Sequence, residues 1–229
     1  MTQITLDNII IQITEKNIKY LRLKVFAPPG EVRISVPLHT PLSIIKAFIT
    51  SKLEWIKRKQ AAFEARPFIP KHDYVEGEIH RIWGKNHLCK LYKHPSPHIK
   101  VTHEELQLHL PLNTSYAKKK TLVEQFHKQL LQQAIPTLIT YWEAIMGVKV
   151  NHFTLQTMKS RWGSCNIKTS IIKLNSELAK YAPIYLEYVV VHEMVHLLEP
   201  SHNYRFKSFM DQFLPEWRSY KQQLNTFSI

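Results

Sequence analysis

Glycine and cysteine are scarce in this chain, which has 5 glycines and 2 cysteines among 229 residues. So few glycines leave no glycine-rich loop of the kind that cradles nucleotide phosphates. The two thiols, Cys89 and Cys165, are too few for a cysteine-rich zinc site, and a single disulfide would be unusual in a secreted chain of this size. We therefore expect both cysteines to be reduced and the protein to be cytoplasmic.

Long hydrophobic runs and acidic residues are also in short supply. No apolar run approaches the roughly twenty residues that span a bilayer, so we expect no membrane partner. The first residues lack the basic and apolar segments of a signal peptide. Basic residues number 31 against 18 acidic ones, which gives a formal net charge of +13. This excess favours nucleic acid or nucleotides as partners, although charge that is spread along a chain also serves solubility.

Residues 1–114 are predicted to form an antiparallel, β-rich region with one long helix. Apolar residues alternate with polar ones at 9–13, 18–26 and 32–36, which is typical of strands. A Pro-Pro-Gly turn at 28–30 predicts a hairpin between the last two strands. We find no internal repeat in the sequence. The expected helix begins at Leu42 and is ended by Arg66-Pro67, and further short strands are expected at 78–83, 87–92, 99–102 and 106–110.

Residues 115–229 are predicted to form a zincin-like metallohydrolase domain, either separate from the first region or continuous with it. A second long helix begins this domain, and Pro136 should kink or split the helix before Gly147 ends it. A small sheet and the helix that carries the main motif should follow, so the expected fold class is α+β. The long helix is expected at 116–145, strands at 150–158 and 170–175, and a compact turn at 160–165.

The most informative stretch is H-E-x-x-H at 192–196, which lies in an apolar helical pattern. His192 and His196 are four residues apart, so they lie on one helix face and can bind one metal ion. Glu193 lies beside the first ligand, where it can accept a proton from a metal-bound water. The pattern predicts a zinc hydrolase site. The alternative is that these are ordinary core histidines, because 13 histidines make such a pair easier to find by chance.

A third imidazole follows six residues after the second. Glu199 and Pro200 turn the chain, and His202 comes directly after that turn, so His202 is the expected third ligand. Glu216 is the alternative, because some zinc hydrolases use a downstream glutamate. Three protein ligands leave one position for water, which is the arrangement of a catalytic zinc site. Metzincins share the six-residue step, but they have glycine where this chain has Glu199, so we reject that assignment.

Five short motifs carry a resemblance to a known family. In order and spacing, as well as in letters, they resemble the YgjP-like metallopeptidases, a zincin-like group related to SprT and WLM-type metalloproteases. The resemblance implies that His192, His196 and His202 bind Zn²⁺ and that Glu193 is the general base. The motifs are S-R-W-G-S-C at 160–165, I-K-L-N at 172–175, A-P at 182–183, Y-V-V-V-H-E-M-V-H at 188–196 and S-H-N-Y-R-F at 201–206.

The expected activity is zinc-dependent hydrolysis of a peptide or protein. Arg161 and Tyr204 are candidate donors to the oxyanion that develops during such a reaction. Ile171–Asn175 is the candidate edge strand on which an extended substrate would pair. In two alternative functions the chain still binds a metal ion, but the ion serves another purpose. One is a nucleotide pyrophosphohydrolase, a label that is also applied to this family, and the other is a nucleic-acid-associated protein with structural zinc.

Overall fold

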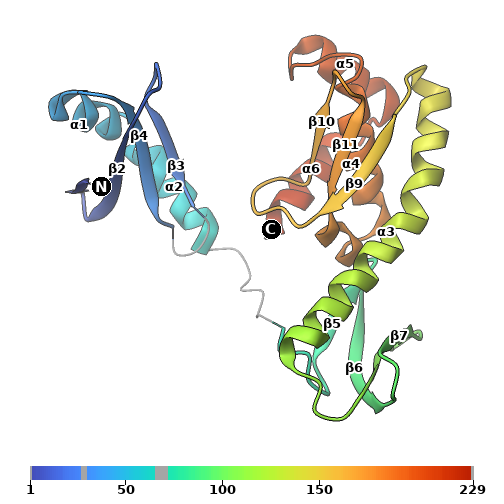
Figure 1. Cartoon of the computed structure of the whole chain (residues 1–229). Coiled ribbons are helices and arrows are strands. Elements are labelled where there is room, and N and C mark those ends of the chain that lie inside the picture. The colour runs from blue at the N-terminus through green and yellow to red at the C-terminus, as the bar shows by residue number, and fades with distance from the viewer. Residues whose placement is uncertain (1, 27–29, 65–71, 228–229) are drawn as a thin grey trace. The chain divides into compact units, whose positions relative to one another are not determined.

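The structure, a computed structural model, describes residues 2–26, 30–64 and 72–227 (Figure 1). Its internal contacts divide the chain into two compact units, Met1–Ile69 and Pro70–Ile229. Both units contain helices and mixed sheets, which confirms the predicted α+β class. Among the described residues, no helix is both long and apolar enough to cross a membrane.

The first unit contains one four-stranded sheet and two helices. Its elements are β1 (Thr2–Leu6), β2 (Ile9–Lys16), β3 (Arg22–Val25), β4 (Val32–Pro37), α1 (Leu42–Thr50) and α2 (Leu53–Glu64). The strand order is β1-β2-β4-β3. Strands β3 and β4 pair antiparallel, which confirms the predicted hairpin, although residues 27–29 of its turn lie outside the described part. Strands β2 and β4 are parallel, because β3 takes the edge position and β4 returns beside β2. The sheet is therefore mixed, and its two other strand pairs are antiparallel.

The single long helix expected after β4 is in fact two helices. The chain turns at Ser51 and Lys52, where the Ser51 hydroxyl donates to the Phe48 carbonyl at 2.7 Å and helps to end α1. Ile49 of α1 and Ile56 of α2 are both fully buried in one core with the sheet. The helical periodicity continues across the break because both helices must place apolar residues on the same sheet face.

The second unit begins with another four-stranded sheet, formed by β5 (Ile79–Ile82), β6 (Lys85–Lys93), β7 (His98–Val101) and β8 (Glu105–Leu110). Its order is β5-β6-β8-β7, with β6 and β8 parallel and the two other pairs antiparallel. This arrangement reproduces that of the first sheet. The chain thus uses one strand arrangement twice, although no repeat is visible in the sequence. Alternating apolar positions and turns are enough to specify such a sheet, whichever side chains occupy them.

Helix α3 (Tyr116–Met146) connects this sheet to the rest of the second unit. It continues through Pro136, which the sequence analysis expected to kink or split it, and it ends as predicted at Gly147, whose φ of 68° is left-handed. Its first half buries Val123 in the core of the second sheet, and its second half buries Leu131 and Ile135 in the core around the following elements. Because one helix belongs to both cores, the expected boundary between residues 114 and 115 falls inside a compact unit.

A three-stranded sheet, one 3₁₀ helix and three α-helices complete the second unit. They are β9 (His152–Gln156), β10 (Gly163–Asn166), β11 (Ile171–Asn175), the 3₁₀ helix η1 (Ser176–Lys180), α4 (Pro183–Val195), α5 (Tyr204–Phe213) and α6 (Trp217–Thr226). The order is β10-β11-β9, with β10 antiparallel and β9 parallel to β11. The stretch at 160–165, expected as a turn, therefore ends in a strand. Helix α4 packs against β10 and β11, so the motif helix lies on a small sheet.

Candidate metal centre

Helix α4 holds the H-E-x-x-H motif in a buried position. Pro183 occupies its first turn, where a missing backbone N–H costs nothing. Three consecutive valines, Val189, Val190 and Val191, are buried, so the helix is fixed from several sides. His196 caps its C-terminal end, and the chain then turns towards α5. The apolar body of the helix thus fixes the direction in which its polar residues point.

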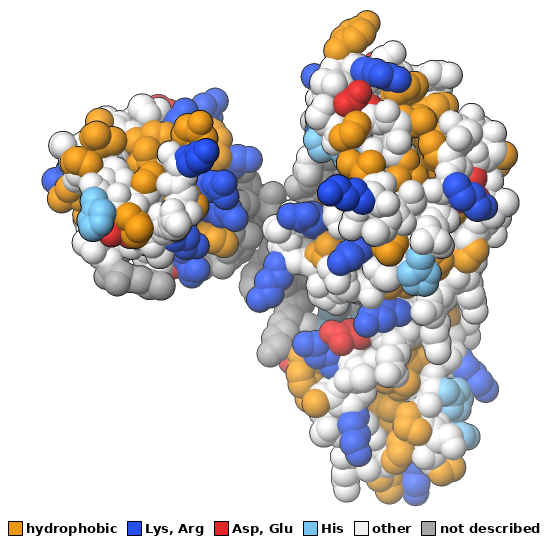
Figure 2. Space-filling view, turned by 45° about the horizontal axis from the view of Figure 1, so that its top comes forward, with side chains coloured by type: hydrophobic (Ala, Val, Ile, Leu, Met, Phe, Trp, Pro, Cys, Tyr) orange, Lys and Arg blue, Asp and Glu red, His pale blue; other side chains and the backbone are white. Residues whose placement is uncertain are grey.

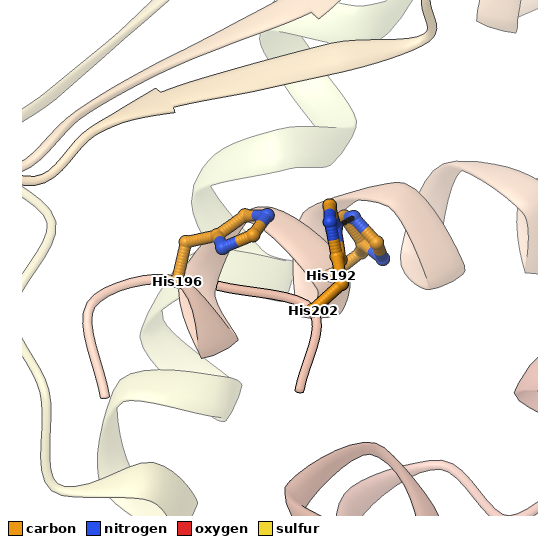
Figure 3. A group of neighbouring side chains, drawn as sticks. All are labelled: His192, His196 and His202. Atoms are coloured by element: carbon orange, nitrogen blue, oxygen red, sulfur yellow. Dashed lines mark hydrogen bonds between the residues drawn. The ribbon is translucent and has the colours of Figure 1, made fainter. Parts of the chain in front are cut away.

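The three predicted ligands lie together (Figure 3). Their ligand atoms are all within 4.8 Å of one another, and His192 Nε2 is 3.0 Å from His202 Nε2. The rings of His196 and His202 have centroids 4.7 Å apart. Phe206, which is buried at the start of α5, contacts all three rings and limits their movement. The chain around the turn at Pro200 therefore brings His202 to the histidines of the helix.

The donor set fits a zinc ion. His196 Nδ1 faces the Glu199 carbonyl oxygen at 3.3 Å, which leaves Nε2 for a metal. Burial lowers the pKa of His192 to about 3, with the charges of His196, His202 and Lys221 adding to this effect. Burial also lowers the pKa of His196 and of His202. The imidazoles are therefore neutral at pH 7, as metal ligands must be, and three neutral nitrogen donors are a typical zinc set.

Glu193 lies beside this cluster and is only 5% exposed. Burial raises the pKa of its carboxyl group to about 8, and the charge of Arg161 works in the opposite direction. Gly163 of β10 lies directly against this side chain, since a Cβ added to Gly163 would be 2.6 Å from Glu193 Oε1. The carboxyl group is therefore held in a narrow space beside the histidines.

Strand β10 is the edge strand at the site. The expectation that Ile171–Asn175 forms this edge was wrong, because β11 pairs with β10 on one side and β9 on the other. Instead, Gly163, Ser164 and Cys165 of β10 line the cavity beside the histidines. Burial, with the Glu193 charge, raises the pKa of the Cys165 thiol to about 11, so this thiol is protonated at neutral pH.

Asn175 holds the segment that leads into β10. Its side-chain amide donates to the Met158 carbonyl at 2.9 Å and to the Arg161 carbonyl at 3.1 Å, and its oxygen accepts from the Glu177 amide. Its backbone N–H donates to the Trp162 carbonyl at 2.9 Å. Asn175 is fully buried, so these bonds are protected from water. The I-K-L-N motif thus fixes the start of the S-R-W-G-S-C segment.

A cavity of about 480 Å³ opens over the cluster. Arg161 lies at its wall, whereas Tyr204 is 87% exposed and is not among the lining residues. Sequence reasoning missed three further wall residues. Tyr188 lies four residues before His192 on α4. This helical spacing could have shown that the two side chains lie on the same face. Lys221 and Asn225 come from α6, and no local pattern places that helix at the site.

A comparison with known families agrees with this geometry. The model described as YgjP-like, metallopeptidase domain, matches residues 19–227. The chain belongs to the YgjP-like metallopeptidase family. It is therefore a hydrolase of the peptidase class, and the family implies a metal cofactor, which the three histidines are suited to hold.

Two solved structures are partly similar to this YgjP-like chain. They are the metallopeptidase zymogens abylysin, from Pyrococcus abyssi, and jannalysin, from Methanocaldococcus jannaschii. Each is 18% identical, and the matches cover 40% and 39% of this chain and 92% of each solved chain, with TM-scores of 0.38 and 0.35. A search of curated proteins gives no significant match.

Proposed function

We propose that this protein is a zinc-dependent peptidase in which His192, His196 and His202 hold the ion. The observation that carries the proposal is the convergence of the three ligand atoms within 4.8 Å of one another. Glu193 is the proposed general base, supported by its position in the cavity wall with the three histidines and by its burial there. The two unpaired cysteines are consistent with a cytoplasmic location, which stays a prediction.

Zinc at this position would polarise the scissile carbonyl and make water easier to deprotonate. In the proposed reaction, Glu193 accepts the proton of the attacking water and later donates it to the leaving amine. Arg161 is the proposed donor to the oxyanion, because it lies in the cavity wall and its charge reaches Glu193. Tyr188, which is buried in the same wall with its ring 5.9 Å from that of His192, is a second donor candidate.

The substrate is proposed to be an extended peptide. One side of β10 pairs with β11, so the other side offers backbone N–H and C=O groups along the cavity wall. A peptide of any sequence can pair with such an edge strand, because main-chain groups make the contacts. The side chains of the cavity then decide which peptides are accepted.

The test pairs metal analysis with the Glu193→Gln variant. The wild type should bind zinc at the three histidines and cleave peptides or casein-type proteins. The variant should retain the zinc, and its rate should fall by about 10² to 10⁴, which is the range for loss of a general base. A variant that retains zinc and full activity would contradict the proposed role of Glu193. Wild-type protein without zinc would contradict the metal site.

Two other functions of the site have weaker support. Cleavage of nucleoside triphosphates without cleavage of peptides would favour a pyrophosphohydrolase. The positive cavity residues Arg161 and Lys221 would suit its anionic substrate. A nucleic-acid-binding protein with structural zinc would be indifferent to Glu193→Gln. On the face shown in Figure 2, Lys and Arg side chains are dispersed over the surface rather than gathered in one patch, so charge alone does not favour this last function.

A further inference from the structure

A second group of potential metal ligands lies in the second unit, at the start of the four-stranded sheet. His72 precedes β5, Glu78 is the last residue before β5, and His80 lies within it. Their ligand atoms are all within 4.8 Å of one another. His72 Nδ1 is 2.7 Å from Glu78 Oε1, and His80 Nε2 is 3.3 Å from Glu78 Oε2. The rings of His72 and His80 stack with centroids 4.2 Å apart.

The carboxylate at the centre of this group is held in place by the backbone. The N–H groups of Asp73 and Tyr74 donate to Glu78 at 3.1 and 2.7 Å, and that of Val75 donates at 3.3 Å. Lys119 of α3 donates to the Tyr74 carbonyl at 3.2 Å, so the loop before β5 is fixed to that helix. Hydrogen bonds of this kind orient a ligating carboxylate in known metal sites.

A simple structural role accounts for Glu78 but not for the histidine on the strand. Glu78 closes the loop before β5, and His72 adds one hydrogen bond to it. His80, however, is 2% exposed, and its Nε2 atom makes no properly oriented hydrogen bond among the described residues, although it lies near Glu78. Buried polar atoms of this kind are rare in folded proteins and are commonly satisfied by water or an ion.

Helix α3 carries a further buried imidazole. His127 is buried, and its Nε2 atom, like that of His80, has no hydrogen-bond partner among the described residues. Burial lowers the pKa of His127 to about 3, and the charges of Lys180, His80 and His72 lower it further. Neutral imidazole is the form that binds metals.

We infer that His72, Glu78 and His80 form a second metal site, for a divalent ion that prefers nitrogen ligands, such as Zn²⁺. Two imidazoles and one carboxylate are a donor set that zinc accepts. The ion would bind between the imidazole nitrogens of His72 and His80 and the carboxylate of Glu78, which already lie close to one another. Because the ligands join the loop before β5 to the strand itself, the site would be structural. It does not depend on the proposed peptidase chemistry.

The test counts zinc ions in the full chain. Wild-type protein saturated with Zn²⁺ should contain two ions per chain. The triple variant with His192, His196 and His202 each changed to Gln should retain one ion, and X-ray absorption should show imidazole nitrogen and carboxylate oxygen around it. A wild type that saturates at one ion, or a folded triple variant that binds none, would overturn the second site.

Single variants assign the ligands. His72→Gln and His80→Gln should each reduce the wild-type count from two ions to one and remove the rise in melting temperature that the second ion gives. His87→Gln is the matched control, because His87 is also buried and lies opposite His80 on β6, but does not belong to the ligand group. Retention of two ions by both ligand variants would overturn the proposal. If His80→Gln does not fold, two other variants still decide whether the second site exists. They are His72→Gln, whose substitution is at a partly exposed residue, and the triple variant.

Discussion

Gly163 lies so close to Glu193 that no side chain fits between them. A Cβ at Gly163 would be 2.6 Å from Oε1, 2.8 Å from Cγ and 2.9 Å from Cδ of Glu193. Real Cβ atoms do not approach other atoms this closely. The glycine of the R-W-G-S-C motif is therefore needed for space, since it lets the edge strand β10 approach helix α4.

The first prediction concerns Gly163→Ala. The new methyl group must displace the Glu193 carboxyl group, and a shift of about 1 Å in a catalytic group can lower a rate by about 10². We expect kcat for peptide cleavage to fall by about that factor, while the zinc content stays unchanged because the three atoms nearest the new methyl group all belong to Glu193. Steady-state kinetics and metal analysis of the same preparation check this.

Gly147→Ala provides the control for that variant. Gly147 has no neighbouring atoms within 4 Å of an added Cβ, but its φ of 68° is unfavourable for alanine. This change should therefore cost stability, on the order of 1 kcal/mol, and leave kcat unchanged. Equal loss of activity in both variants would show that the effect of Gly163→Ala is a general one on folding.

Sequence reasoning grouped the three candidate ligands because their positions follow from local geometry. The spacing of His192 and His196 is fixed by the helix, and the turn at Pro200 is fixed by proline, so His202 could be added without knowledge of the fold. The edge strand could not be found in this way. Whether Ile171–Asn175 or Gly163–Asn166 forms the edge depends on which strands pair, and pairing is a long-range property.

The fold, too, has features that follow from local patterns and features that depend on long-range contacts. Periodicity predicted the class and most of the elements, but not the repeated sheet arrangement or the break between α1 and α2. Pro136 does not split α3, and Ile135 and Ile139, which lie before and after it, are both buried in one core. Lys221 joins the cavity only because α6 packs beside α4. Contacts between distant segments therefore account for what the sequence could not show.

The second prediction concerns Asn175→Ala. This change removes the donor to the Met158 and Arg161 carbonyls, and it leaves buried backbone groups without partners. Each such group costs about 1–3 kcal/mol, so we expect the free energy of unfolding to fall by a few kcal/mol. Urea denaturation of the metal-loaded protein measures it. A loss below about 0.5 kcal/mol, the usual effect of a surface change, would contradict the role of Asn175 as a brace.

The third prediction separates the two oxyanion candidates named from the sequence. Arg161 lines the cavity, so Arg161→Ala should lower kcat by about 10² to 10³, the range for loss of one oxyanion donor. Tyr204 is 87% exposed and does not line the cavity, so Tyr204→Phe should change kcat little. Kinetics at saturating substrate distinguish them. The reverse order of effects would make Tyr204 the donor to the oxyanion. It would also require α5 to move when substrate binds.

The fourth prediction concerns acid stability. Burial lowers the pKa of His127 to about 3 in the folded chain, against about 6.5 in the unfolded chain. Between these values the unfolded state binds more protons, so stability is full above pH 6.5 and falls as the pH drops towards 3. His127→Leu should reduce this slope by at most about 1.4 kcal/mol per pH unit. Urea denaturation from pH 4 to 7, with chelator present, tests this, and the exposed His103 provides the control in His103→Leu. Identical slopes for both variants would contradict the burial of a neutral imidazole.

The fifth prediction concerns the charge of the cavity. Lys221 of α6 lines the cavity, and its charge lowers the pKa of both His192 and His202, so it lies within electrostatic reach of the ion site. With Arg161 it makes the wall around Glu193 positive. Peptides with Asp or Glu near the scissile bond should therefore be cleaved in preference to otherwise identical peptides with Lys.

The variant Lys221→Ala should reduce that preference, measured as the ratio of kcat/KM for the two peptides. A partly exposed ion pair contributes up to about 1 kcal/mol, so the ratio should fall by up to about fivefold, and salt should have the same effect because it screens such pairs. Lys207→Ala is the matched control, because Lys207 is an exposed lysine of α5 that does not line the cavity. A ratio that is unchanged in Lys221→Ala, or that falls equally in both variants, would show that Lys221 does not select the substrate. In that case the net charge of +13 would act on substrates only as a diffuse field.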